Sequence, residues 1–151
     1  MWQALLSIAI IIGGITVVPP VASAQSEPGR CTAGAFTATP PSGSTVAPGR
    51  KIVYRLEIVV RGDTAVLGCA RTMLASGLLA FVAVQPDGSY RPDMSFGPMA
   101  EVSFTGPIDP GTRLRGWIVM RVRADAPAGA VIEARSGDVI RHVVRTRRPQ
   151  R

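Results

Sequence analysis

Apolar and polar residues alternate most regularly between positions 51 and 60. Five apolar side chains share one face of this segment: Ile52, Tyr54, Leu56, Ile58 and Val60. The alternate positions carry Lys51, Val53, Arg55, Glu57 and Val59. Because successive side chains of a strand point to opposite sides, this pattern predicts a half-buried β-strand. Turn residues bound the segment, with Pro48-Gly49 before it and Arg61-Gly62-Asp63 after it.

A second alternating segment covers residues 113–124. Ile118, Met120 and Val122 are expected to face the core. The opposite face carries Arg115, Trp117, Val119, Arg121 and Arg123. Further short strands are predicted at residues 35–38, 64–71, 78–84, 94–96, 101–104, 130–135 and 138–145. Turn signals separate them, at 39–44, 86–89, 107–111 and 127–129.

Seven to nine short strands without a helical pattern predict an all-β fold, an antiparallel sandwich of two sheets. Residues 74–84 read as helical by composition alone, but the β-branched Val82 and Val84 favour a strand. We expect three parts in the exported chain: an N-terminal arm at 25–34, the sandwich at 35–145 and a disordered Arg-rich tail at 146–151.

The first 24 residues are typical of a signal peptide. An apolar run from residue 4 to 18 is broken by Pro19-Pro20 and followed by the small-residue cleavage pattern Ala22-Ser23-Ala24. Cleavage would leave Gln25 at the N-terminus of a secreted or cell-surface protein. The alternative is an uncleaved membrane anchor, since no Lys or Arg precedes the apolar run.

Export favours a disulfide between Cys31 and Cys69, the only cysteines, stapling the N-terminal strand to a sheet. Two buried free thiols or an intermolecular link are the alternatives. Two cysteines and a single histidine are too few for an ordinary zinc site, so no metal or cofactor is predicted.

The net charge of +7 is concentrated in one part of the sequence. Residues 25–112 hold seven basic and seven acidic side chains, whereas residues 113–151 hold ten Arg against three acids. Such a cationic region attracts acidic polysaccharides and other polyanions, and the alternative is a solvated strand face with a charged tail. The candidate anion- or glycan-binding residues are Arg115, Trp117, Arg121, Arg123, Arg141 and Arg145.

No catalytic constellation is recognisable, so we expect no enzyme and no small-molecule substrate. His142 is the sole histidine and lies among several Arg, where positive charge disfavours the imidazolium that a general base must become. Arg61-Gly62-Asp63 spells an integrin-type tripeptide, but Gly and Asp also belong there as plain turn residues.

Four turn and strand motifs occur along the chain in a fixed order. Pro48-Gly49 precedes Ile52 and Tyr54, and Pro86-Asp87-Gly88 follows the strand at 78–84. A second Pro-Gly turn lies at 108–111 and a closing hairpin at 124–132. This order resembles the conserved immunoglobulin-like repeat domain of bacterial and archaeal cell-surface proteins, a domain of unknown function, in a single divergent copy. The resemblance implies an extracellular structural or adhesive module and supplies no catalytic residues.

These inferences lead to a secreted or surface-attached, non-catalytic β-sandwich that works structurally or by adhesion in the envelope or matrix. Its expected partners are envelope or matrix proteins, acidic polysaccharide or another polyanion, and further copies of itself. One alternative is a filament subunit whose N-terminal arm adds a strand to its neighbour. Another is a binder of anionic glycans through the Arg-rich C-terminal half.

Overall fold

The computed structural model describes residues 25–146, and these residues form ten β-strands and no helix. The strands are β1 (Arg30–Thr39), β2 (Thr45–Val46), β3 (Lys51–Arg61), β4 (Val66–Ala75), β5 (Leu79–Gln85), β6 (Asp87–Arg91), β7 (Met99–Ile108), β8 (Arg113–Val122), β9 (Val131–Ser136) and β10 (Asp138–Val144). The described part of the chain contains no helix able to cross a membrane. The predicted signal peptide and residues 147–151 of the predicted tail lie outside the described residues.

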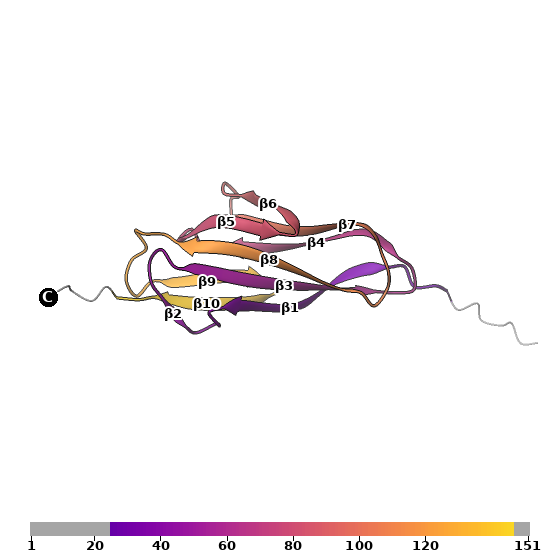
Figure 1. Ribbon diagram of the computed structural model, residues 1–151, viewed down its shortest axis with the longest axis horizontal. Helices are drawn as coiled ribbons and strands as arrows, with labels where there is room; N and C mark the ends of the chain where they lie inside the picture. The colour runs from indigo at the N-terminus through magenta and orange to yellow at the C-terminus, as the bar shows by residue number, and fades with distance from the viewer. Residues whose placement is uncertain (1–24, 147–151) are drawn as a thin grey trace, which may run out of the picture.

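The strands form two stacked sheets, which confirms the predicted all-β sandwich (Figure 1). One sheet has four strands in the order β1-β3-β8-β5, and the other has six in the order β2-β10-β9-β4-β7-β6. All neighbours are antiparallel except β2 and β10, which are parallel over two residue pairs. The ends of the described chain leave the sandwich at opposite ends of its long axis (Figure 1).

The two alternating segments lie side by side as β3 and β8 and supply much of the core. Their predicted inward residues are all at most 1% exposed, namely Ile52, Tyr54, Leu56, Ile58, Val60, Ile118, Met120 and Val122. The six-stranded sheet covers them with buried side chains that include Met73, Val102 and Ile132. Gly116 on β8 permits this close packing, because a Cβ there would lie 2.1 Å from Cγ2 of Val102.

Three sequence predictions of local structure are wrong. Residues 94–96 form no strand, because the chain turns there before β7. Residues 87–89 lie in strand β6 rather than in a turn, since the chain passes from one sheet to the other at the cis peptide Gln85-Pro86. The count of ten strands exceeds the expected seven to nine, because two-residue β2 and five-residue β6 line the edges of the six-stranded sheet.

The N-terminal arm is shorter than predicted, since β1 already begins at Arg30. Residues 30–33 pair with residues 58–61 of β3. The segment before β1 is also held: the backbone N–H of Glu27 donates to the Asp63 carboxylate at 2.8 Å, and that of Gly29 donates to the Thr64 hydroxyl at 2.8 Å. The N-terminal segment that would add a strand to a neighbouring molecule is therefore hydrogen bonded to its own domain. The Asp63 carboxylate of the Arg61-Gly62-Asp63 turn already accepts one of these hydrogen bonds.

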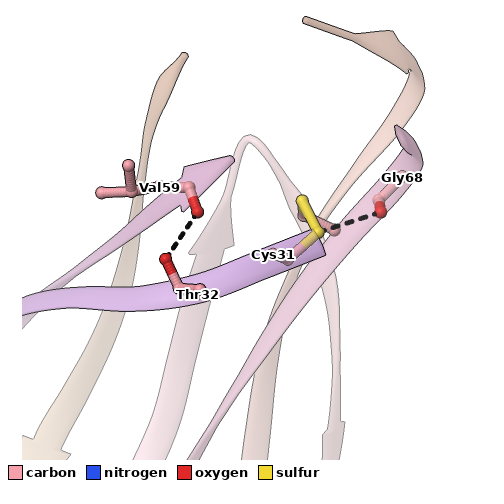
Figure 2. The surroundings of a disulfide bond; sticks show 5 residues. Cys31, Thr32, Val59 and Gly68 are labelled. Carbon is pink, nitrogen blue, oxygen red and sulfur yellow. Dashed lines mark hydrogen bonds between the residues drawn. A yellow bond between two sulfur atoms is a disulfide. The ribbon is translucent and has the colours of Figure 1, made fainter. Parts of the chain in front are cut away.

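The disulfide expected from the sequence is present between Cys31 and Cys69, and it joins β1 of one sheet to β4 of the other (Figure 2). Cys31 Sγ also lies 3.3 Å from the carbonyl oxygen of Gly68. This is a van der Waals contact and not a hydrogen bond, because a disulfide sulfur carries no proton. Beside it, the Thr32 hydroxyl donates to the Val59 carbonyl at 2.8 Å (Figure 2). Covalent and hydrogen bonds together fix the start of the edge strand β1.

A buried Arg lies between the sheets. Arg71 of β4 is 8% exposed, and its guanidinium donates to the Ser136 hydroxyl and carbonyl at 2.9 and 2.6 Å. Its Nη1 lies 3.0, 3.0 and 2.6 Å from the carbonyl oxygens of Gly34, Ala35 and Glu57. The first two carbonyls belong to a bulge in β1, where the register with β3 shifts. Arg71 therefore satisfies backbone acceptors that the interrupted ladder leaves inside the sandwich.

Candidate functional site

Basic side chains are concentrated on the outer face of the four-stranded sheet, along the paired strands β3 and β8. The register of β3 and β8 sets Lys51 opposite Arg121 and Arg55 opposite Trp117. It also sets Glu57 opposite Arg115, with Arg113 one row further on. We call this surface the basic face and define it by five cations: Lys51, Arg55, Arg113, Arg115 and Arg121.

A single carboxylate neutralises one end of the basic face. Glu57 Oε1 accepts a hydrogen bond from Arg113 Nη1 at 2.8 Å, and its Oε2 lies 3.5 Å from Arg115 Nε. The Glu57 side chain is only 13% exposed, whereas Arg113 and Arg115 are 61% and 62% exposed. Gly34 of β1 makes room for it, since a Cβ there would lie 2.8 Å from Glu57 Oε1.

At the other end the cations have no acidic partner. Lys51, Arg55 and Arg121 are exposed and form no ion pair with any residue that the structure describes. Lys51 and Arg121 are cross-strand neighbours about 5 Å apart, which is less than the Debye length of about 8 Å at physiological ionic strength. Their positive potentials therefore reinforce one another, and an anion placed over this pair interacts with both cations.

Trp117 lies in the middle of the basic face and is half-buried. The register places Arg55 of β3 on one side of it and Gln85 of β5 on the other. Within the described chain, its indole N–H makes no hydrogen bond and its ring stacks on no other aromatic side chain. A cation, an aromatic ring and an amide thus form one row across three strands.

Two hollows flank the row formed by Lys51 and Arg121. One is lined by Thr39, Pro40, Gly49, Arg50, Lys51 and Val53. The other is lined by Gly49, Ala80, Arg121, Val122, Arg123, Ala124 and Asp125. Gly49 borders both hollows, so the surface is recessed on each side of this cationic pair.

The structure brings together three of the six predicted binding residues, Arg115, Trp117 and Arg121. Arg123 lies beyond the end of β8 and is paired with Asp125, its Nε 3.0 Å from the carboxylate. The hydrogen bond from Arg123 holds the pKa of the Asp125 carboxyl below its ordinary range. Arg123 is therefore at the margin of the basic face and already neutralised.

Arg141 belongs to the other sheet, and Arg145 lies just beyond its strand β10. Arg141 of β10 donates to Glu133 of β9 at 2.8 Å, and Arg135 donates to the same carboxylate at 2.7 Å. The two hydrogen bonds, with that from Arg141 the larger cause, lower the pKa of Glu133. Arg145 follows the end of β10, where its backbone N–H donates to the Val46 carbonyl. Arg145 also lines a hollow with Pro48, Ala124 and Asp125 at the end of the sandwich. The predicted set of Arg is thus divided between the outer face of the four-stranded sheet, the other sheet and the loops at one end.

Sequence reasoning missed Lys51, Arg55, Arg113 and Gln85 as members of this surface. The signal for the first two was present, because the alternation of residues 51–60 turns both away from the core. What it did not reveal was the partner strand. Only the pairing of β3 with β8 joins a locally charge-balanced segment to the Arg-rich half of the chain.

The remaining chemical candidates do not form a reactive site. His142 is fully buried, and its Nε2 donates to the Pro40 carbonyl at 2.9 Å, so the imidazole cannot reach a substrate. Residues 25–146 contain no cluster of three His, Cys, Asp or Glu that could hold a metal ion.

The outer face of the six-stranded sheet carries a groove lined in part by Leu74, Phe96 and Val131, with Phe96 60% exposed.

No protein-family model and no curated protein matches this chain. Two solved cohesin domains are similar to it in structure. The seventh ScaB type I cohesin from Pseudobacteroides cellulosolvens has 12% identity and a TM-score of 0.44, covering 73% of this chain and 84% of that one. The sixth cohesin of scaffoldin B from Acetivibrio cellulolyticus, in complex with a mutant Cel5 dockerin, has 14% identity and a TM-score of 0.42, covering 74% and 97%. With values this low, neither structure assigns a family or a partner to this chain.

Proposed function

We propose that this chain is an exported, non-catalytic β-sandwich module that attaches to polyanionic components of the cell envelope or extracellular matrix. The basic face carries the proposal. It presents five cations against one carboxylate, and three of those cations have no acidic partner in the described chain.

The architecture supports a binding role for this face. Regular pairing with β3 and β5 holds β8 in the interior of its sheet, so the charged side chains project from rigid backbone. A ligand then meets cations whose positions are already fixed, which reduces the entropic cost of binding. Arg offers two parallel N–H groups to a carboxylate, sulfate or phosphate, and four of the five cations are Arg.

The signal-peptide pattern and the disulfide support an extracellular location. A disulfide persists in an oxidising compartment and resists unfolding where no chaperone acts. The structural and adhesive roles inferred from the sequence agree with this proposal, because a module anchored to an envelope polymer contributes to both.

Retention on heparin-agarose tests the proposal. The double variant Arg55→Glu, Arg121→Glu should elute at clearly lower salt than the parent protein, because it removes two unpaired cations and adds two acids. The matched control is Arg91→Glu, Arg135→Glu, which changes the net charge equally but lies on β6 and β9 of the other sheet. Equal losses in both pairs would mean that net charge alone causes retention, and a parent protein that is not retained at low salt would refute the proposed function.

A further inference from the structure

The basic face contains more than charge, because its central row combines three kinds of side chain. Arg55, Trp117 and Gln85 are cross-strand neighbours on β3, β8 and β5. Arg55 and Gln85 are exposed, and Trp117 is half-buried between them. The indole is half-buried between cross-strand neighbours on both sides, so part of it packs on the sheet and part stays accessible to a ligand.

Each of these groups matches one part of an acidic sugar. The face of an indole packs against the C–H groups of a pyranose ring, and aromatic contacts of this kind favour the apolar side of a polar molecule. A guanidinium takes a carboxylate or sulfate in a bidentate pair. A carboxamide both donates to and accepts from ring hydroxyls.

We propose that the basic face binds an acidic polysaccharide, with one sugar ring packed on Trp117, its carboxylate or sulfate on Arg55 and its hydroxyls on Gln85. This inference rests on the proposed function and names the class of polyanion. The chemistry of the row decides the class: a bare polyphosphate gains nothing from an indole and an amide, whereas a uronic acid residue uses all three groups.

The spacing of the cations on the basic face aligns a bound polymer with the strands. Arg121 lies four positions after Trp117 on β8, and Lys51 lies four positions before Arg55 on β3. At about 3.3 Å per residue, the second cationic row lies about 13 Å along the strands. Between the two rows the surface consists of short aliphatic side chains, Val53, Val119 and Ala83, which are paired across the sheet.

An extended chain that lies along β8 therefore meets an anion site at Arg55, an apolar strip and a second anion site at Lys51 and Arg121. The hollows beside the second row leave space for substituents of the polymer. Acid groups of a polysaccharide chain can occupy both anion sites, while the sugar rings between them cover the aliphatic strip.

The composition of the chain provides a specific probe, since Trp2 and Trp117 are its only indoles. Exported protein carrying Trp2→Phe would report Trp117 fluorescence alone, whether or not the leader is retained. Polygalacturonate, a uronic acid polymer, should change the intensity and wavelength of this emission. Polyphosphate at equal charge and ionic strength should leave the emission unchanged.

Calorimetric titrations of variants supply the second measurement. Trp117→Ala should weaken polygalacturonate binding about tenfold, the order of an aromatic contact, while polyphosphate binding stays unchanged. Trp117→Phe should restore part of the loss, since a smaller ring still covers part of the sugar. Phe96→Ala removes an exposed aromatic from the loop between β6 and β7, away from the basic face, and should change neither titration.

The outcomes separate this inference from the proposed function. If Trp117→Ala changes neither titration or weakens both equally, while Arg55→Glu, Arg121→Glu abolishes binding, then polysaccharide recognition is wrong and polyanion attachment remains. If single-stranded DNA binds more tightly than polygalacturonate and depends equally on Trp117, base stacking explains the ring and the assignment to polysaccharide fails. If charge reversal affects no titration, both proposals fail.

Discussion

Replacing Arg71 with Met should destabilise the sandwich more than replacing any exposed Arg. The guanidinium links three strands of the two sheets, because it donates to carbonyls of β1 and β3 and to Ser136 of β9. Met has a similar apolar stem and fills much of the same space, but it offers no donor. The variant therefore tests the hydrogen bonds of the charged group with little change in packing volume.

The magnitude follows from the five acceptor contacts of Arg71. Hydrogen bonds from a charged donor contribute about 1.5–3 kcal/mol each, but the desolvation of the guanidinium offsets much of that sum. Burial indeed lowers the pKa of Arg71, so the surroundings disfavour its charge to some degree. Removal of the guanidinium leaves buried carbonyls without a donor, at about 1–3 kcal/mol for each group that stays unsatisfied, so we expect a net loss of about 3–5 kcal/mol. With an unfolding entropy of about 2.1 cal/mol/K per residue, 122 described residues convert this to a fall in Tm of about 12–20 °C.

Thermal and urea denaturation followed by circular dichroism would measure the change. Arg91→Met on exposed β6 is the matched control and should shift Tm by no more than a few degrees. Arg71→Lys should fall between the two, because an ammonium keeps the charge but cannot reach acceptors on three strands at once. If Arg71→Met is as stable as Arg91→Met, the carbonyls of the β1 bulge need no internal donor and our account of the buried Arg is wrong.

Two further predictions concern the disulfide and the buried Tyr54. The double variant Cys31→Ala, Cys69→Ala should lose about 4 kcal/mol of unfolding free energy in urea, since the bridge spans a sequence separation of 38; a loss below about 1 kcal/mol would show that β1 pairing alone fixes the N-terminal strand. Tyr54→Phe should leave stability at pH 7 unchanged or raise it by about 1 kcal/mol, because the buried hydroxyl has no partner among the described residues. Burial raises the pKa of Tyr54 above its unfolded value of about 10, so the parent protein should lose stability as pH rises above 10 while Tyr54→Phe loses less; a variant less stable than the parent at pH 7 would mean that the hydroxyl is hydrogen bonded.

The Arg-rich C-terminal half illustrates how far sequence reasoning reaches. Counting charges located the excess correctly, and alternation within residues 113–124 placed Arg115, Trp117 and Arg121 on one outward face. The same reasoning grouped Arg141 and Arg145 with them, although Arg141 belongs to the other sheet and Arg145 lies beyond the end of β10. Proximity in sequence was a poor guide here, because in a sandwich consecutive strands frequently change sheets.

Arg71 shows a second limit. Its place in the sequence, within a segment predicted to be a strand, gave no sign that it would be buried. Its burial depends on the bulge of β1, which exposes carbonyls of Gly34 and Ala35 to the interior. The bulge in β1 and Arg71 in β4 lie far apart in the sequence and meet only in the folded protein. The sequence around one of them therefore does not predict the other.

The sequence by itself determined the side-chain periodicity of β3 and β8, the residues that face the core and the pair of cysteines that could be joined. These features depend on local rules, since a period of two assigns each side chain to a face wherever the strand lies. Tertiary structure decided which strands pair and in which register, and hence that Lys51 lies opposite Arg121 and Arg55 beside Trp117. Pairing between residues more than 60 positions apart is selected by the packing of the whole core, and the basic face exists only after that selection.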